Sequence, residues 1–194
     1  MRQTILIALL IISTHLSFAR TAQANNSQQK ITYRDTTVSI ADTRQMLAAI
    51  MNVLGLQADF ELKEAKVANI EASISHRKRY ILYNPSFISW INNTTKDKWA
   101  AITLLSHEVG HHLNGHTIRK SGSIPALELE ADEFAGFVLY KLGASLEQAQ
   151  EVMKHIAKTE ASRTHPARNS RMLAIENGWS KAANSAAIIA TAKK

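Results

Sequence analysis

Cysteine is absent from this chain of 194 residues. Its absence excludes a disulfide framework, an iron–sulfur cluster, a cysteine-based zinc finger and a thiol nucleophile. Any metal site must therefore use histidine and carboxylate ligands. Proline and glycine are also scarce, with three and seven residues, and we find no internal repeat of roughly 20 to 50 residues, so a solenoid is disfavoured.

Long apolar runs are lacking beyond residue 24, so we expect no transmembrane segment in the mature chain. Residues 1–24 themselves combine a basic start, an apolar run over residues 5–12 and a final small-x-small sequence, AQA. This pattern is typical of a secretory signal peptide that is cleaved before Asn25. We therefore expect export to the periplasm or full secretion, with an uncleaved N-terminal anchor as the alternative.

Acidic residues are outnumbered, 16 against 23 lysines and arginines, which gives a formal net charge of +7. The densest basic cluster, residues 76–79, separates two strand-like runs and is expected to be a solvated hairpin turn. No basic stripe interleaved with aromatic residues is present, so we expect no nucleic-acid partner. A modest positive charge suits a protein that works near anionic envelope surfaces, and a partner in the envelope is compatible with it.

The hydrophobic pattern predicts an α+β chain in which a small antiparallel sheet packs on helices. Alternating residues predict strands at 31–40, 60–64, 67–75 and 80–83. The last two are expected to form an antiparallel hairpin across the basic turn. Helical spacing and capping residues predict helices at 42–54, 85–91, 94–113, 123–143, 145–158 and 166–178.

These elements suggest one domain over residues 25–179, with the last helix ending at Gly178. Residues 180–194 are small, with no cap and no clear period, and are expected to form a loosely ordered tail. Ser145 and Gln148 have the spacing of a capping box, which predicts the start of one helix.

The sequence His107-Glu108-Val109-Gly110-His111 has the form HExxH. Residues four apart on a helix share a face, so His107 and His111 can both offer an imidazole to one metal ion. Glu108 is rotated by about 100° from His107, beside the metal, where a carboxylate can take a proton from a water molecule. The alternative is an exposed polar stripe on a surface helix. The apolar residues at 99–105 argue against that alternative, because they give this helix a core to face.

Two carboxylates on the next predicted helix supply what this motif needs. Glu128 and Asp132 are again four residues apart and share a face. Glu128 can complete a set of two histidines and one glutamate, which is known for catalytic zinc. Asp132 can accept a hydrogen bond from the free ring N–H of a ligating histidine. Glu130 and Glu133 point elsewhere and are expected to be solvated.

Three motifs occur in a fixed order: HEVGHHLNGH, then ELEADEFAG, then Thr164-His165-Pro166 followed by Arg171. Together they resemble the gluzincin metallopeptidases of the HtpX, CAAX prenyl protease and BepA-like group, over about half of the chain. The resemblance implies a helical zincin core and one Zn²⁺ ion per chain. Its implied ligands are His107, His111 and Glu128. It further implies Glu108 as general base and Asp132 as the hydrogen-bond partner of His107. It also implies that a strand upstream, for which 80–83 is the candidate, pairs with an extended peptide substrate.

His165 and Arg171 have two interpretations each. From the sequence alone, His165 is a helix-entry residue and Arg171 is a charge on an exposed helix face. The resemblance places both in the active site, where either can stabilise the oxyanion of the reaction. Alternatively, His165 occupies a metal coordination position and holds the enzyme latent. Three further histidines, His112, His116 and His155, are expected to be structural or solvated.

The sequence therefore favours a zinc-dependent endopeptidase that acts on extended or misfolded polypeptides of the envelope or the exterior. A first alternative is a zinc-containing chaperone or binding module that recognises envelope proteins without cutting them. A second is a structural zinc domain, which would need a fourth protein ligand, and His165 is the best candidate for it.

Overall fold

The computed structural model describes residues 40–118 and 124–191. The signal peptide predicted at 1–24 and the strand predicted at 31–40 lie outside these residues, apart from residue 40. Within the described part, the chain is α+β, as expected, and its elements follow in the order α1 (Ile40–Leu54), β1 (Glu61–Glu64), β2 (Ile70–Ser75), β3 (Lys78–Tyr83), α2 (Pro85–Thr95), α3 (Trp99–Leu113), the short 3₁₀ helix η1 (His116–Ile118), α4 (Pro125–Leu142), α5 (Leu146–Ile156) and α6 (Arg168–Thr191).

The sheet is mixed, whereas the sequence predicted an antiparallel one. The hairpin of β2 and β3 is antiparallel, as predicted, and pairs Ala72 with Ile81. However, β1 pairs with β3 in parallel, and the strand order is β1-β3-β2. The hairpin returns β3 to the middle of the sheet because β3 carries Ile81 and Tyr83, whose side chains are fully buried. A central strand receives this apolar surface better than an edge strand does.

The basic cluster forms the tight hairpin turn that the sequence predicted. His76 and Arg77 both have positive φ, 49° and 64°, which is the backbone of a type I′ turn. Both side chains are exposed. The turn therefore sets the register of the hairpin and leaves these two side chains in solvent. Arg79, at the end of the basic cluster, is partly buried instead and donates to the carbonyl oxygen of His112.

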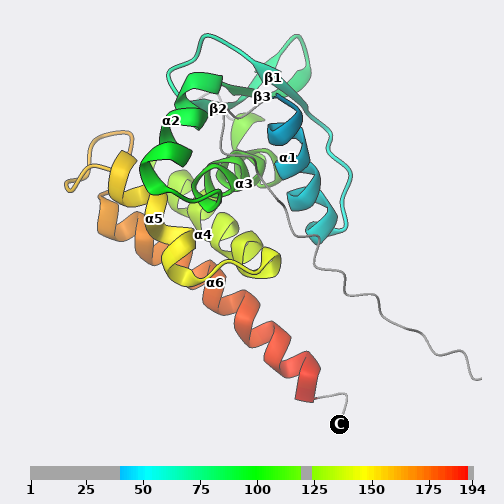
Figure 1. Ribbon diagram of the computed structural model, residues 1–194, viewed down its shortest axis with the longest axis vertical. Coiled ribbons are helices and arrows are strands. Elements are labelled where there is room, and N and C mark those ends of the chain that lie inside the picture. Colours follow the sequence, from blue (N-terminus) through cyan, green and yellow to red (C-terminus); the bar gives the residue numbers. More distant parts are fainter. Residues whose placement is uncertain (1–39, 119–123, 192–194) are drawn as a thin grey trace, which may run out of the picture.

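Helix α3 lies at the centre of the molecule, with the sheet above it and the other helices around it (Figure 1). Its N-terminal amide, at Trp99, donates to Oδ1 of Asp97 at 3.0 Å. Most of its length is buried, from Trp99 to Gly110. A helix that is buried on all sides provides a rigid support for the side chains of the HExxH motif.

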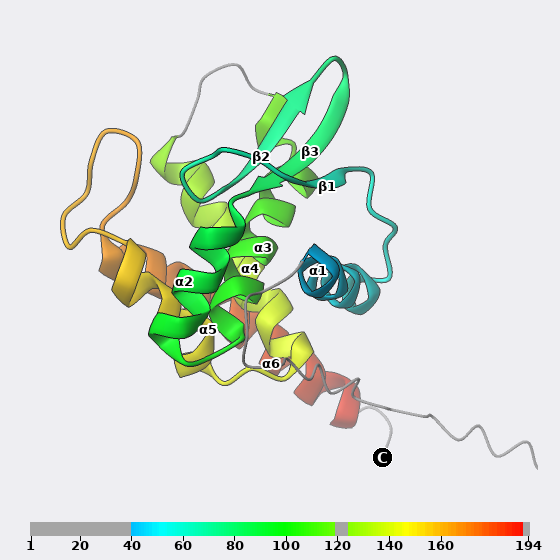
Figure 2. The same ribbon diagram turned by 45° about the horizontal axis from the view of Figure 1, so that its top comes forward.

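Helix α6 packs along α4 and then extends beyond it (Figure 2). The prediction that this helix ends at Gly178 is wrong, because α6 continues to Thr191. Residues 180–191 are thus helical turns, while 192–194 lie outside the described residues. Gly178 allows close packing: a Cβ there would lie 1.7 Å from the carbonyl oxygen of Glu133 on α4. Gly136 on α4 meets the backbone of Ile175 in the same way.

The remaining helix ends follow local signals. Ser145 and Gln148 form the predicted capping box at the start of α5. Gly143 ends α4 with a φ of 91°, which an L-residue rarely adopts. Helix α2 runs four residues further than predicted, to Thr95. None of the helices in 40–118 and 124–191 has the length and apolarity needed to span a bilayer.

Candidate metal centre

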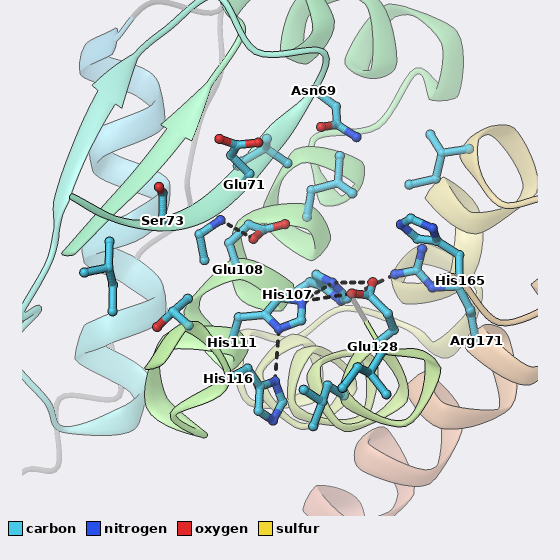
Figure 3. A pocket seen from close by; sticks show the side chains of 18 residues that line it. Asn69, Glu71, Ser73, His107, Glu108, His111, His116, Glu128, His165 and Arg171 are labelled. Atoms are coloured by element: carbon cyan, nitrogen blue, oxygen red, sulfur yellow. Dashed lines mark hydrogen bonds and ion pairs between the residues drawn. The ribbon is translucent and has the colours of Figure 1, made fainter. Parts of the chain in front are cut away.

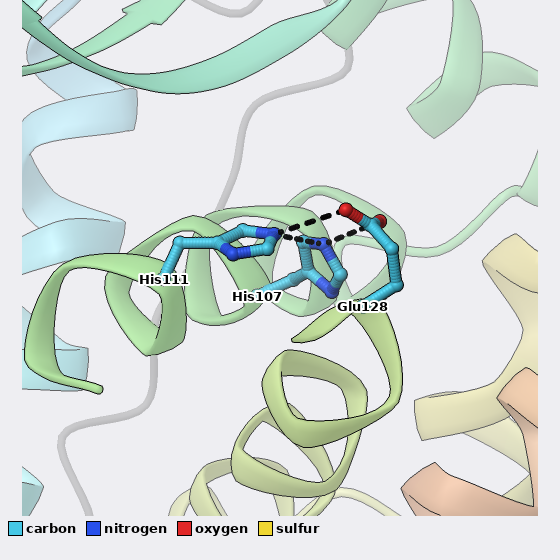
Figure 4. Close-up of side chains that lie close together, drawn as sticks. All are labelled: His107, His111 and Glu128. Atoms are coloured by element: carbon cyan, nitrogen blue, oxygen red, sulfur yellow. Dashed lines mark hydrogen bonds and ion pairs between the residues drawn. The ribbon is translucent and has the colours of Figure 1, made fainter. Parts of the chain in front are cut away.

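Three side chains from two helices converge on one point (Figure 4). The Nε2 atoms of His107 and His111 on α3 lie 3.0 Å apart. The two carboxylate oxygens of Glu128 on α4 lie 3.5 Å and 3.6 Å from these nitrogens. One ligand atom from each residue lies within 4.8 Å of the others, so the group can hold a metal ion. The structure thus brings together the three residues that the sequence predicted as metal ligands.

The two helices can come this close because small residues face each other between them. Gly110 on α3 lies against Ala131 and Phe134 of α4, and a Cβ at Gly110 would be 3.3 Å from the Cα of Ala131. Ala131 is fully buried. A larger side chain at either position would push Glu128 away from the two histidines.

The Nδ1 side of His107 contacts a buried ion pair between Asp132 and Arg171. Its Nδ1 lies 2.8 Å from Oδ1 of Asp132, whose side chain is fully buried. Arg171 on α6 donates to both oxygens of Asp132, at 2.6 Å and 2.7 Å. Burial alone lowers the pKa of His107, but the carboxylates of Asp132, Glu128 and Glu108 together outweigh burial and raise this pKa to about 10 in the metal-free protein. Burial raises the pKa of Asp132, and the charges of His107 and Arg171 outweigh it and hold that pKa below its usual value.

The Asp132–His107 contact is the one that sequence reasoning predicted, but the contact of Arg171 with Asp132 was missed. Arg171 is buried, not an exposed charge on a helix face. Its guanidinium lines the cavity described below and is bound to Asp132 through Nε and Nη2. Thirty-nine residues separate the two partners, so no local pattern indicates the pair.

His111 has a different support. Its Nδ1 lies 3.0 Å from Nδ1 of His116, and Nε2 of His116 lies 2.9 Å from the carboxylate of Glu130. Burial, together with the neighbouring charge of His107, lowers the pKa of His111 to about 4. Sequence reasoning assigned Glu130 to solvent and missed this contact, although the turn at Asn114-Gly115 was a signal that the chain folds back there.

Glu108 lies on the sheet side of the metal group, with its carboxylate at the wall of the same cavity (Figure 3). Its Oε2 accepts a hydrogen bond of 2.6 Å from the backbone N–H of Ala72 on β2. Burial raises the pKa of Glu108 to about 7, even though His107 and the Ala72 N–H both favour the ionised form. A carboxyl group with a pKa near neutrality can both accept and release a proton under physiological conditions.

A cavity of about 610 Å³ opens over the metal group. Residues 69–74, which include most of β2, form one wall, and α3, α4, His165 and Arg171 form the others (Figure 3). The prediction that residues 80–83 are the strand that pairs with an extended peptide is wrong, because β3 is already paired on both sides. The strand that borders the cavity is β2, which among residues 40–118 and 124–191 pairs with β3 alone.

His165 lies in the loop before α6, and its side chain is exposed at the cavity wall. Its Nδ1 is 2.9 Å from Oγ1 of Thr164, and its backbone N–H donates to Oγ of Ser162 at 3.0 Å. In residues 40–118 and 124–191, the group that can hold a metal ion contains His107, His111 and Glu128, and His165 is outside it.

Two other histidines have the structural or solvated roles expected of them. His112 is buried, and its Nε2 lies 2.9 Å from the carbonyl oxygen of Tyr80, which ties α3 to the sheet. His155 is exposed on α5, with its Nε2 3.2 Å from Glu151. Of the three histidines on α3, His107 and His111 thus meet at the metal group because they are four residues apart, whereas His112 contacts the sheet.

Comparison with known proteins finds no matching family model, no matching curated protein and no matching solved structure. The functional assignment therefore depends on the geometry of the site and on the motifs in the sequence. The geometry itself fits a metal: two imidazoles and a carboxylate, largely buried, are the donor set of one class of catalytic zinc site.

Proposed function

We propose that this chain is a zinc-dependent endopeptidase that hydrolyses peptide bonds in extended or misfolded polypeptides. In this proposal the enzyme is exported to the periplasm or the exterior. The observation that carries the proposal is the group of His107, His111 and Glu128, with the buried carboxylate of Glu108 beside it in an open cavity. The resemblance of three ordered motifs to gluzincin peptidases supports it, and a zincin core is part of the same proposal.

In this proposal, His107, His111 and Glu128 hold one Zn²⁺ ion per chain. When bound, zinc supplies Lewis acidity, which polarises the scissile carbonyl and lowers the pKa of water to about 7. Asp132 keeps the hydrogen of His107 on Nδ1, so that Nε2 offers its lone pair to the metal. Arg171 holds Asp132 in that orientation through two hydrogen bonds.

Glu108 is the general base of the proposed reaction. It takes a proton from the attacking water molecule and then passes that proton to the leaving amine. Its raised pKa suits both steps. A carboxylate with a much lower pKa would not take the proton, and a group with a much higher pKa would not release it. The N–H of Ala72 fixes the direction in which the carboxylate points.

The open edge of β2 gives a reason for preferring extended substrates. An extended peptide can add to a sheet edge as a further strand, held by main-chain hydrogen bonds. A folded protein has already used these backbone groups, so it cannot pair in this way. Leu104, Leu127 and Ile156 line the cavity and offer apolar contacts to side chains of such a peptide.

The roles of His165 and Arg171 in the reaction remain proposals with alternatives. Two nitrogens of Arg171 are bound to Asp132, which favours orientation of His107 as its main role. His165 is exposed at the cavity wall and either stabilises the oxyanion or holds the enzyme latent. Turnover of His165→Ala separates these two ideas: a fall supports the first, a rise supports the second, and no change rejects both.

The test of the function is cleavage of an unfolded protein, reduced casein, by the purified protein and by Glu108→Gln, with zinc counted in both. Cleavage by the wild type alone, with about one zinc ion in each protein, supports the peptidase and its base. We expect turnover of Glu108→Gln to fall by a factor of about 10² to 10⁴. Zinc in both proteins with no cleavage in either would favour the non-cutting binding module or a latent enzyme.

A further inference from the structure

The imidazole of His111 has a second nitrogen, which faces away from the metal group. This Nδ1 lies 3.0 Å from Nδ1 of His116, and the two rings meet edge to face with centroids 5.1 Å apart. Nε2 of His116 lies in turn 2.9 Å from Oε2 of Glu130. His111, His116 and Glu130 thus form a line of contacts from the metal group to the surface of the molecule, and Figure 3 shows the contact between the first two.

His116 is buried, although the end of this line is not. Its side chain is 3% exposed, whereas that of Glu130 is 58% exposed. His116 begins η1 directly after Gly115, whose φ of 73° turns the chain back over the end of α3. Burying an imidazole costs free energy unless its polar atoms have partners. Here both ring nitrogens have one.

One arrangement of hydrogens satisfies all of these contacts while His111 acts as a ligand. Ligation through Nε2 needs a neutral imidazole with its hydrogen on Nδ1. That N–H can donate to Nδ1 of His116 only if this nitrogen has a free lone pair. The hydrogen of His116 then lies on Nε2 and is donated to the Glu130 carboxylate. The negative charge of Glu130 favours this arrangement, because its carboxylate accepts the hydrogen on Nε2 of His116.

We propose that His116 and Glu130 are positioning residues that orient His111 for metal binding and raise the affinity of the site for zinc. They do for His111 what Asp132 and Arg171 do for His107. The two sides differ in chemistry, since a buried carboxylate supports one ligand and a histidine with a surface carboxylate supports the other. The inference depends on the metal site of the proposed function, but not on peptidase activity.

The rival explanation is that His116 only packs the turn between α3 and α4. That role would affect the stability of the metal-free protein, but it would give Glu130 no influence on zinc. Under the rival, Glu130→Gln leaves the Kd for zinc unchanged, whereas the proposal predicts a several-fold rise that disappears when His116 is already alanine. Zinc affinity in single and double variants therefore separates the two explanations.

The experiment measures the Kd for Zn²⁺ of the full chain by competition with a chromogenic chelator. The variants are His116→Ala, Glu130→Gln and the combination of both. The matched control is Glu133→Gln, because Glu133 is also an acidic residue on the outer part of α4 but is paired with Lys181. Thermal unfolding of each metal-free protein is measured beside it, so that changes in folding are seen independently.

We expect the Kd of His116→Ala to rise by about 10- to 100-fold, as removal of a ligand's partner commonly does. The Kd of Glu130→Gln rises several-fold, and the double variant binds no more weakly than His116→Ala, because Glu130 acts only through His116. Glu133→Gln binds as the wild type does. His116→Gln, which keeps an acceptor for His111 and a donor for Glu130, recovers part of the affinity.

A Kd for His116→Ala within twofold of the wild type, or additive losses in the double variant, would overturn the proposal. If His116→Ala does not fold, Glu130→Gln against Glu133→Gln decides: a several-fold difference supports the proposal and equal Kd values overturn it. A wild type that binds no zinc would instead overturn the metal site itself, which is a distinguishable result.

Discussion

Asp132 and Arg171 form a buried ion pair with two hydrogen bonds beside the metal group. The carboxylate of Asp132 is fully buried, and the guanidinium of Arg171 satisfies both of its oxygens. The pair also links α4 to α6, and through His107 it reaches α3. One ion pair thus contributes both to folding and to the orientation of a ligand.

Replacing Arg171 with Met leaves Asp132 as a buried carboxylate with one partner fewer. We expect the free energy of unfolding of the metal-free protein to fall by about 3 to 5 kcal/mol, as when one member of a buried ion pair is removed. Urea unfolding in the presence of a chelator measures it. The control is Lys181→Met, which breaks an exposed pair with Glu133 and should cost about 1 kcal/mol or less. Equal losses in the two variants would contradict this reading of the pair.

At the scale of elements, the contact between α4 and α6 depends on glycine. Gly178 lies where a Cβ would be 1.7 Å from a backbone carbonyl of α4. In an ordinary helix interior, Gly→Ala is stabilising by roughly 0.5 to 1 kcal/mol. At this position, the clash is with backbone, which cannot rotate away, so the sign of the effect should reverse.

We therefore expect Gly178→Ala to lower the free energy of unfolding by about 1 to 3 kcal/mol, in the range of overpacked cores. The variant is compared with Asn184→Ala, an exposed position on the same helix, where alanine should be neutral or slightly stabilising. Chemical denaturation of both proteins provides the measurement. A stabilised Gly178→Ala protein would show that the helices are not this close in solution.

The position of β2 beside the cavity leads to a second prediction at the scale of elements. If substrates pair with its free edge, alternate backbone amides of a peptide face the strand. We expect N-methylation of an amide that faces β2 to raise KM by tenfold or more, and N-methylation of its neighbours to have little effect. A series of singly methylated peptides, assayed for cleavage, would reveal this period of two. A uniform effect along the peptide would argue against strand pairing.

At the scale of the whole molecule, a bound metal would join α3 and α4 at the centre of the fold. A ligand at about 1,000 times its Kd stabilises a protein by about 4 kcal/mol. For a chain of this size, this corresponds to a shift in Tm on the order of ten degrees. We expect a chelator to lower the Tm by this amount and added zinc to restore it. His111→Ala should show no such response, and an unresponsive wild type would contradict the metal site.

Much of the candidate site could be predicted from the sequence, because its parts are local. Residues four apart on a helix share a face whatever surrounds them, which places His107 beside His111 and Glu128 beside Asp132. The hairpin across residues 76–79 and the capping box at Ser145 are local in the same sense. Each of these features depends on backbone geometry over a few residues.

Only the tertiary structure decided which residues far apart in the chain contact each other. The order of strands placed β2, not β3, at the open site, because the buried side chains of β3 are best covered in the middle of the sheet. Arg171 met Asp132, and His116 met Glu130, since helix packing brought their elements together. Gly178 serves as a packing position and not as a helix end, because its effect depends on the α4 backbone beside it. No pattern of a few residues contains that information.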